Sequence, residues 1–238
     1  MAFKIALTAG HYRNTPGKRC LKSLDPKETR EWVLNDRIAD KVEKLLQGYT
    51  GWELLRTDDT TGKKNIGLTA RTNAANNWKA DFYLSIHHNA GVCGGTGGGI
   101  MAYVYTKADA ETLAWQKDLY NALIAATGLK GNRGTPLAKA NLHECRETKM
   151  PAVLLELGFM DSQTDVPVIL TEDYADQCAS AIVEVLARRG KLEKKQPAQE
   201  SPGKLYRVQV GAYSVKANAE AQVRKLKAAG FEAVITER

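Results

Sequence analysis

Short apolar runs alternate with amphipathic segments along most of the chain. The apolar runs predict five β-strands, which are FKIALTA (3–9), WELLR (52–56), FYLSIH (82–87), IMAYVY (100–105) and AVLLEL (152–157). Apolar residues recur at helical spacing near residues 28–47, 69–78, 108–127 and 172–189. Strands that alternate with helices in this way predict an α/β fold, with a mostly parallel twisted sheet flanked by helices.

The pattern changes after residue 188. Residues 189–203 have no apolar periodicity and are rich in Pro, Gly, Gln and charge, which predicts a linker. The segments that follow predict a strand (LYRVQVGAY), an amphipathic helix that ends at Gly230 and a second strand (FEAVIT). We therefore expect a large domain at 1–188, a linker at 189–203 and a small βαβ unit at 204–238. So small a unit buries too little apolar surface to be stable alone, and it needs a partner, a second copy or further sequence.

Composition and charge narrow the class of protein. Hydrophobic residues make up 43% of the chain and charged residues 26%, as in an ordinary globular protein. No apolar run approaches the ~20 residues of a membrane span, so we expect no membrane insertion. Of the net charge of +7, residues 189–238 carry +6, with eleven Lys and Arg against five Asp and Glu. This basic tail suits an anionic polymer, and a nucleic acid is disfavoured because aromatic residues are not interleaved with the basic ones.

The N-terminus and the cysteines indicate a cytoplasmic product. MAFKIALTAGH has no basic segment ahead of its apolar run and no clear cleavage site, so it predicts a buried first strand and not a signal peptide. The four cysteines are scattered and form no CxxC pair, which favours reduced thiols over a cysteine zinc cage.

Two histidines follow predicted strands. His11 comes directly after the first strand, and His87 ends the central one. Because the carboxyl ends of parallel strands share one edge of a sheet, the two imidazoles can meet there and, with a carboxylate, hold zinc. The carboxylate candidates are Glu28 and Glu31. DPKE (25–28) predicts a helix start in which Glu28 completes a capping box, so we prefer Glu31 as the ligand.

A carboxylate also interrupts a strand that is predicted to be buried. Glu156 lies inside AVLLELGF, where an ionised group is costly unless it is paired or coordinated. Burial raises the pKa of a carboxyl group toward neutrality, which suits a general acid or base. This favours a catalytic role for Glu156 over a structural one.

Other candidate ligands receive weaker support. His87 and His88 are adjacent, so strand alternation sends them to opposite faces of the sheet and they do not share a metal; periodicity does not choose between them. His143 and Cys145 offer two ligands of a second metal site, but two are too few, and a surface or substrate-lining role for His143 is favoured.

Five segments together resemble a known family. They are TAGH (8–11), EWVLN (31–35), LTART (68–72), SIHHN (85–89) and MPAVLLELGFMDS (150–162). In this order and spacing they resemble the zinc-dependent N-acetylmuramoyl-L-alanine amidases of the amidase-3 family, over about residues 1–188. The resemblance implies cleavage of the amide between N-acetylmuramic acid and L-alanine in peptidoglycan. It implies zinc ligands His11, Glu31 and His87, and Glu156 as the catalytic acid/base.

Two positions depart from the family pattern. GHYRN places Tyr12 and Arg13 where the family often has GHGG, and His88 stands where the family usually has a small residue. His88 is therefore expected to be a packing residue or one that orients a ligand.

The C-terminal unit resembles the first half of a SPOR domain, a module that binds peptidoglycan. Because only one half is recognisable, we expect either further sequence or self-association with a second chain. The leading hypothesis is thus a wall-lytic zinc amidase that acts on bacterial peptidoglycan after release from the cell. A phage endolysin freed by a holin and an autolysin freed by mother-cell lysis both fit. The alternative is an inactive wall-binding or regulatory protein on the same fold.

Overall fold

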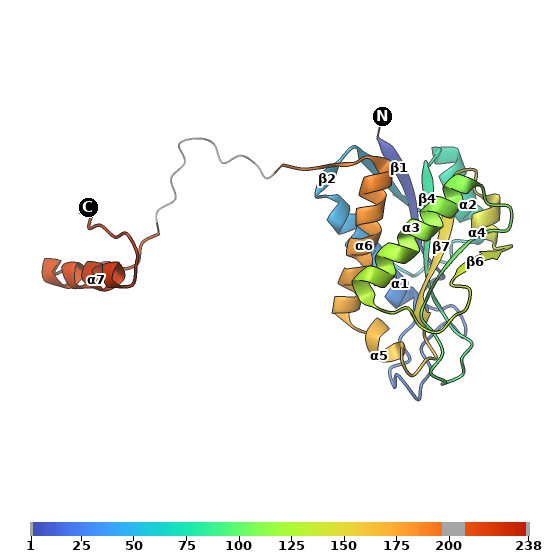
Figure 1. The fold of residues 1–238 in the computed structure, drawn as a ribbon, viewed down its shortest axis with the longest axis horizontal. Helices are drawn as coiled ribbons and strands as arrows, with labels where there is room; N and C mark the ends of the chain where they lie inside the picture. The colour runs from blue at the N-terminus through green and yellow to red at the C-terminus, as the bar shows by residue number, and fades with distance from the viewer. Residues whose placement is uncertain (1, 197–207, 237–238) are drawn as a thin grey trace. The chain divides into compact units, whose positions relative to one another are not determined.

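The computed structural model describes residues 2–196 and 208–236. The chain divides into two compact units, Met1–Lys195 and Gln196–Arg238, and each is described by itself (Figure 1).

A six-stranded sheet forms the centre of the first unit. Its strands lie in the order β3 (Trp52–Arg56), β1 (Phe3–Ala9), β4 (Phe82–Asn89), β7 (Ala152–Phe159), β5 (Ile100–Tyr105) and β6 (Leu137–Ala140). The strands from β3 to β7 are parallel, and β5 runs antiparallel to β7. The connection from β4 to β5 spans only residues 90–99, too short for the crossover that a parallel strand requires. The predicted mostly parallel α/β sheet is confirmed.

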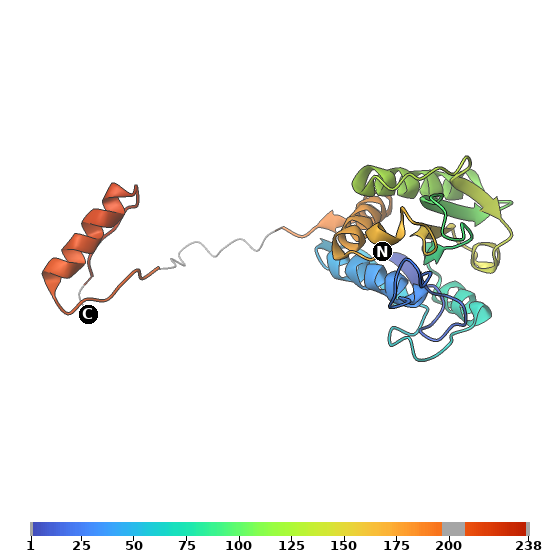
Figure 2. The same cartoon turned by 90° about the horizontal axis from the view of Figure 1, so that it is seen from below.

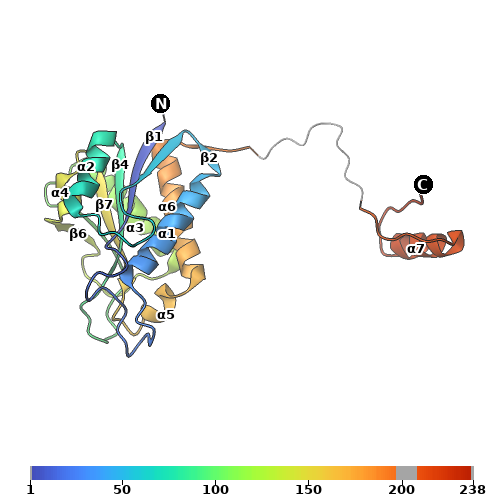
Figure 3. The same ribbon diagram turned by 180° about the vertical axis from the view of Figure 1, so that it is seen from behind.

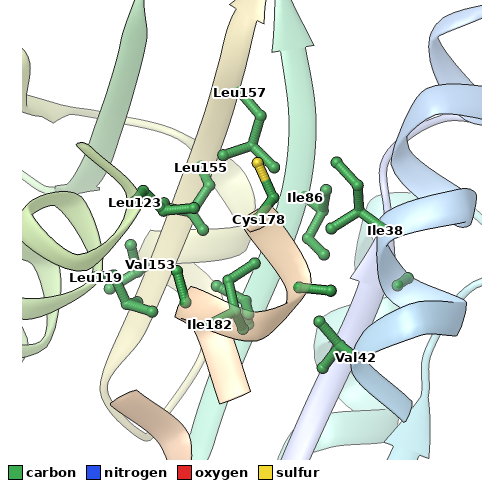
Figure 4. Packing of buried hydrophobic residues seen from close by; sticks show 14 of the residues in the cluster. Ile38, Val42, Ile86, Leu119, Leu123, Val153, Leu155, Leu157, Cys178 and Ile182 are labelled. Carbon is green, nitrogen blue, oxygen red and sulfur yellow. The ribbon is translucent and has the colours of Figure 1, made fainter. Parts of the chain in front are cut away.

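Helices cover both faces of the sheet (Figures 1 and 3). α1 (Glu31–Leu46), α3 (Ala110–Thr127) and α6 (Glu172–Gly190) pack on one face, where α6 contacts both α1 and α3 (Figure 2). α2 (Leu68–Trp78) and α4 (His143–Glu147) lie on the other face, together with Tyr83 of β4. Figure 4 shows the larger core, in which Ile86 and Leu155 from the strands meet Ile38 of α1 and Ile182 of α6.

The carboxyl ends of the parallel strands meet at one edge, as expected. Ala9 pairs with Ile86, and His87 pairs with Glu156. The sequence pattern did not predict the edge strand β6 or the short helix α4. It also did not predict three further short elements: β2 (Tyr49–Thr50), α5 (Val166–Ile169) and β8 (Glu193–Lys194).

One predicted helix begins later than expected. The predicted start near residue 28 is wrong, because α1 begins at Glu31 with Arg30 as its N-cap. The carboxylate of Asp25 instead accepts hydrogen bonds from the backbone N–H groups of Lys27 and Thr29, which closes a local turn. Glu28 has a φ of 49° and pairs with Arg19, so it forms no capping box.

The first unit extends beyond the predicted boundary at residue 188. α6 continues to Gly190, and β8 pairs with β2 in an antiparallel manner. Part of the predicted linker thus belongs to the compact unit, and residues 197–203 lie outside the described residues. In the part of the chain that the structure describes, no helix is both long and apolar enough to cross a bilayer.

Among its described residues, 208–236, the second unit has one helix, α7 (Lys216–Ala228). Gly230 ends it as predicted, with a φ of 88°, and the N–H of Phe231 donates to the carbonyl of Leu226 at 3.0 Å. The two predicted flanking strands are absent among residues 208–215 and 231–236, and residues 205–207 lie outside the described residues. A strand needs a paired neighbour for its backbone groups, and here the apolar side chains of both segments are exposed: Val208, Val210, Tyr213, Val215, Phe231, Val234 and Ile235.

Candidate metal centre and active site

Three side chains from separate elements converge at the carboxyl edge of the sheet. His11 follows β1, Glu31 opens α1 and His87 lies near the end of β4. One ligand atom of each lies within 4.8 Å of those of the other two. His11 Nε2 is 3.2 Å from Glu31 Oε2, and His87 Nδ1 is 3.1 Å from Glu31 Oε1. Two imidazoles and one carboxylate form the donor set that many hydrolytic zinc sites use.

Glycine at position 10 makes room for this arrangement. The N–H of Gly10 donates to the carbonyl of Ile86 at 2.9 Å, which ties the end of β1 to β4. A Cβ atom on Gly10 would overlap the imidazole of His87. Only glycine therefore lets that ring lie over the backbone beside His11.

A buried arginine fixes the backbone at His11 through hydrogen bonds. His11 has a φ of 67°, a left-handed conformation that is uncommon for a residue with a side chain. The guanidinium of Arg71 donates to the carbonyls of Ala9 and His11, each at 2.7 Å. Arg71 comes from the LTART segment of α2, so this segment supports the position of His11.

Glu31 is buried and ionised. Burial alone would raise its pKa, but the imidazoles of His11 and His87 hold the pKa well below its usual value. Its Oε2 atom is buried without a hydrogen-bond partner in the described residues. A buried polar atom that lacks a partner is costly, and the side chains therefore fit a bound cation.

The charge around His87 also favours a cation. Burial alone would lower the pKa of His87, but the carboxylates of Glu144 and Glu31 raise it to about 10. Positive charge at this imidazole is thus stabilised from two sides. The same two carboxylates stabilise the positive charge of a divalent metal ion as they stabilise that of a proton.

Glu156 faces the site from the next strand. It pairs with His87 in the register of β4 and β7. Burial raises the pKa of Glu156 to about 7, and the negative charge of Glu31 adds to this, while the charge of His87 opposes it. Oε2 of Glu156 is buried and has no hydrogen-bond partner in the described residues. A carboxyl group that titrates near neutral pH at this position suits proton transfer.

His88 contacts a different set of residues from His87. Its Nδ1 lies 2.8 Å from Oδ1 of Asn35 in α1, and burial lowers its pKa to about 3, so the ring is neutral. Asn35 Nδ2 in turn donates to the carbonyl of Gly10 at 3.2 Å and to Glu31 Oε1 at 3.4 Å. His88 therefore contributes to the orientation of Glu31 through Asn35, and it is not one of the three converging residues.

Comparison with known proteins decides the family. The sequence model described as N-acetylmuramoyl-L-alanine amidase matches residues 5–188, and the SPOR-domain model matches residues 186–238. A sporulation-specific N-acetylmuramoyl-L-alanine amidase of Bacillus subtilis (strain 168) is 35% identical over 233 residues, which cover 98% of this chain and 84% of the relative. The chain belongs to the N-acetylmuramoyl-L-alanine amidase family. It is a peptidoglycan amidase, as the resemblance in its sequence implies.

Further relatives agree with this assignment. The amidase CwlM of Bacillus licheniformis is 34% identical to this amidase over 237 residues, 99% of this chain and 85% of the relative. The crystal structure of an N-acetylmuramoyl-L-alanine amidase from Clostridium difficile 630 is similar with a TM-score of 0.70 and 27% identity, covering 79% of this chain and 96% of that one. The catalytic domain of the amidase CwlV from Bacillus (Paenibacillus) polymyxa has a TM-score of 0.69 and 25% identity, covering 79% of this chain and 98% of that one.

The residues after His11 shape the edge of the amidase site. The N–H of Tyr12 donates to Oγ1 of Thr15 at 3.1 Å, which closes a turn. The guanidinium of Arg13 lies 5.0 Å from the ring centroid of Trp32, at the start of α1. The GHYRN segment thus places a cation over an aromatic ring beside the site.

The segment LHECRET holds a residue that sequence analysis missed. His143 Nε2 is 3.4 Å from Thr72 Oγ1, and Cys145 Sγ contacts the carbonyl of Tyr103. Within the described residues these two form no metal-ligating group with a third residue. Glu144, between them, is buried, and its Oε2 lies 3.6 Å from Nε2 of His87. No periodicity marks Glu144, because only the packing of α4 on the sheet brings it there.

Proposed function

We propose that this amidase is a zinc enzyme in which His11, Glu31 and His87 hold the metal and Glu156 is the catalytic acid/base. The observation that carries the proposal is the convergence of the three ligand atoms within 4.8 Å, from elements far apart in the sequence. When bound, zinc supplies Lewis acidity toward the scissile carbonyl and toward water. With all four side chains present at one edge, an inactive wall-binding protein on the same fold is disfavoured.

Glu156 moves the proton in this mechanism. As a carboxylate it accepts a proton from the attacking water, and as a carboxylic acid it donates that proton to the departing nitrogen of L-alanine. A pKa near 7 lets the side chain take both forms at neutral pH. Glu31, whose pKa is held low, stays ionised throughout and keeps its negative charge for the metal.

Metal analysis combined with product analysis tests this proposal. We expect about one zinc per purified chain, loss of activity on purified sacculi after chelation, and recovery on addition of zinc. The products are expected to carry new L-alanine amino termini. Full turnover by the metal-free protein, or release of glycan reducing ends without new L-alanine amino termini, contradicts the proposal.

We further propose that the SPOR region binds peptidoglycan and that a second copy of the chain completes it. Seven apolar side chains of the described residues in this region are exposed, on the two strand-like segments that flank α7. A second copy offers the same two segments, so their pairing would bury these side chains and satisfy backbone groups of both chains.

Light scattering and sacculus sedimentation test this second proposal. Dimers are expected to form as concentration rises, and Val210→Asp is expected to prevent both dimer formation and sacculus binding. Lys107→Asp, a charge change in the first unit, serves as the control. Sacculus binding by a chain that stays monomeric would contradict the proposed completion.

We also propose that the enzyme reaches the wall when a sporulating mother cell lyses. The relative from Bacillus subtilis, which the chain matches over 98% of its length, is sporulation-specific. An endolysin of Bacillus phage SPP1 is 33% identical over 82% of this chain. Expression timing separates the two settings, since appearance during sporulation supports the proposal and appearance only on prophage induction assigns holin-dependent release instead.

A further inference from the structure

A buried carboxylate lies behind the imidazole of His87. Glu144 sits in the short helix α4 and is almost completely buried. The hydroxyl of Tyr83 donates to its Oε1 at 2.7 Å, and Oγ of Ser85 donates to its Oε2 at 3.1 Å. Because side chains two apart on a strand share a face, Tyr83, Ser85 and His87 of β4 all point toward α4.

The hydroxyl groups of Tyr83 and Ser85 and the imidazole of His87 surround the carboxylate of Glu144. Arg71 adds a nearby positive charge. A buried charge held in this way is costly unless it acts on a partner, and the partner that it faces is His87.

The imidazole of His87 lies between two carboxylates. Its Nδ1 is 3.1 Å from Glu31 Oε1, on the side of the converging ligands, and its Nε2 is 3.6 Å from Glu144 Oε2. Nε2 is buried and has no hydrogen-bond partner within the described residues. At 3.6 Å the contact with Glu144 is longer than a hydrogen bond.

The tautomer of a metal-binding histidine determines which ring nitrogen carries the hydrogen. A metal binds one unprotonated ring nitrogen, and the other nitrogen then carries the hydrogen. Nδ1 faces Glu31, so Nε2 is the nitrogen that carries the hydrogen and turns it toward Glu144. Carboxylates in this position fix the tautomer and the ring orientation of metal-binding histidines and make them better donors.

We propose that Glu144 is a positioning residue for His87, set in place by Tyr83 and Ser85, which orients the imidazole so that Nδ1 faces the metal. This inference rests on the proposed zinc function of His11, Glu31 and His87. It assigns to Glu144 an effect on zinc affinity that is separate from the turnover chemistry of Glu156. It also explains why a five-residue helix buries an acidic side chain against the sheet.

The rival role for Glu144 is purely structural. The carboxylate joins α4 to β4 through two hydrogen bonds, and a residue that did nothing else would matter for stability alone. Glu144→Gln separates the roles, because the amide keeps the size and can still accept from Tyr83 while the negative charge is lost.

Zinc affinity measured by chelator competition on the full chain tests the inference. We expect Glu144→Gln to weaken zinc binding by roughly 10-fold to 100-fold and to alter the visible absorption of the cobalt-substituted protein. Glu144→Asp, which keeps the charge but shortens the reach, is expected to give an intermediate affinity. Glu147→Gln is the matched control, because Glu147 lies on the same helix, is half exposed and pairs with Arg146; the zinc affinity of this variant is expected to equal that of the wild type.

The outcomes distinguish this inference from the proposed function. If wild-type protein binds zinc but Glu144→Gln binds it equally well and shows only a lower melting temperature, the inference is overturned and the zinc function stands. If wild-type protein binds no zinc, the proposed function fails first. Should Glu144→Gln not fold, Ser85→Ala releases Oε2 from one hydrogen bond and leaves the carboxylate in place. Weaker zinc binding by folded Ser85→Ala supports the inference, and unchanged binding overturns it.

Discussion

The backbone of Gly10 lies against the imidazole of His87, and no side chain fits between them. Gly10 also donates its N–H to the carbonyl of Ile86, so the end of β1 is fixed directly beside the end of β4. The proximity of His11 and His87 therefore depends on a residue with no side chain. This contact makes the site sensitive to a change that adds a single methyl group.

Gly10→Ala is expected to displace the ring of His87 and to weaken zinc binding by more than 10-fold, since the ring cannot stay over the backbone. The first unit should remain folded, because Gly10 follows the last residue of β1 and the change adds one methyl group. Zinc affinity and circular dichroism of the purified variant check this. Gly134→Ala is the control, because a Cβ there meets no atom within 4 Å and its φ is not left-handed; equal zinc affinity of both variants would contradict the account.

Substitutions of His87 and His88 are expected to have different effects. His87→Ala should lose zinc, because it removes a ligand. His88→Ala should keep most of the zinc but lower the free energy of unfolding by about 1–3 kcal/mol, because it leaves Oδ1 of Asn35 buried without its hydrogen-bond partner. Zinc content and denaturant unfolding of the two variants check this. If His88→Ala loses zinc and His87→Ala retains it, the assignment of the ligand is reversed.

The sequence predicted the large sheet well because its strands and helices have clear periodicity. It placed His11, His87 and Glu156 at strand ends or in a strand, and the shared edge of parallel strands brings them together. It could not predict Glu144 or the role of Gly10, because these depend on contacts between elements. The helix start at Glu31 was missed because Asp25 closes a turn and does not cap the helix. The two strands beside α7 follow a strand pattern, but a pattern supplies no pairing partner.

The pH dependence of turnover is expected to reflect Glu156. Burial raises its pKa to about 7, and a bound cation would lower it. As a base Glu156 must be ionised, so kcat/KM should rise with pH along an acidic limb whose midpoint lies at or below about 7. A pH profile of the zinc-loaded enzyme measures this, and an acidic limb centred clearly above 7 would contradict the role of Glu156.

The cysteines are expected to differ sharply in reactivity. Burial raises the pKa values of Cys20, Cys145 and Cys178 to about 12, whereas Cys93 is exposed. The thiolate is the reactive form, so a thiol reagent should modify a single cysteine in the native protein and all four after denaturation. Cys93→Ser should abolish the native reaction. Rapid native modification of a second thiol would show that the core is more open than described.

The central claim separates metal binding from proton transfer within one set of four residues. The most direct test compares zinc content and amide cleavage in Glu156→Gln with those of the wild type and of His87→Ala. Glu156→Gln is expected to hold as much zinc as the wild type while turnover falls by roughly 10²-fold to 10⁴-fold, because only the proton-transfer group is removed. His87→Ala is expected to lose both zinc and turnover. Normal turnover by zinc-loaded Glu156→Gln would contradict the account.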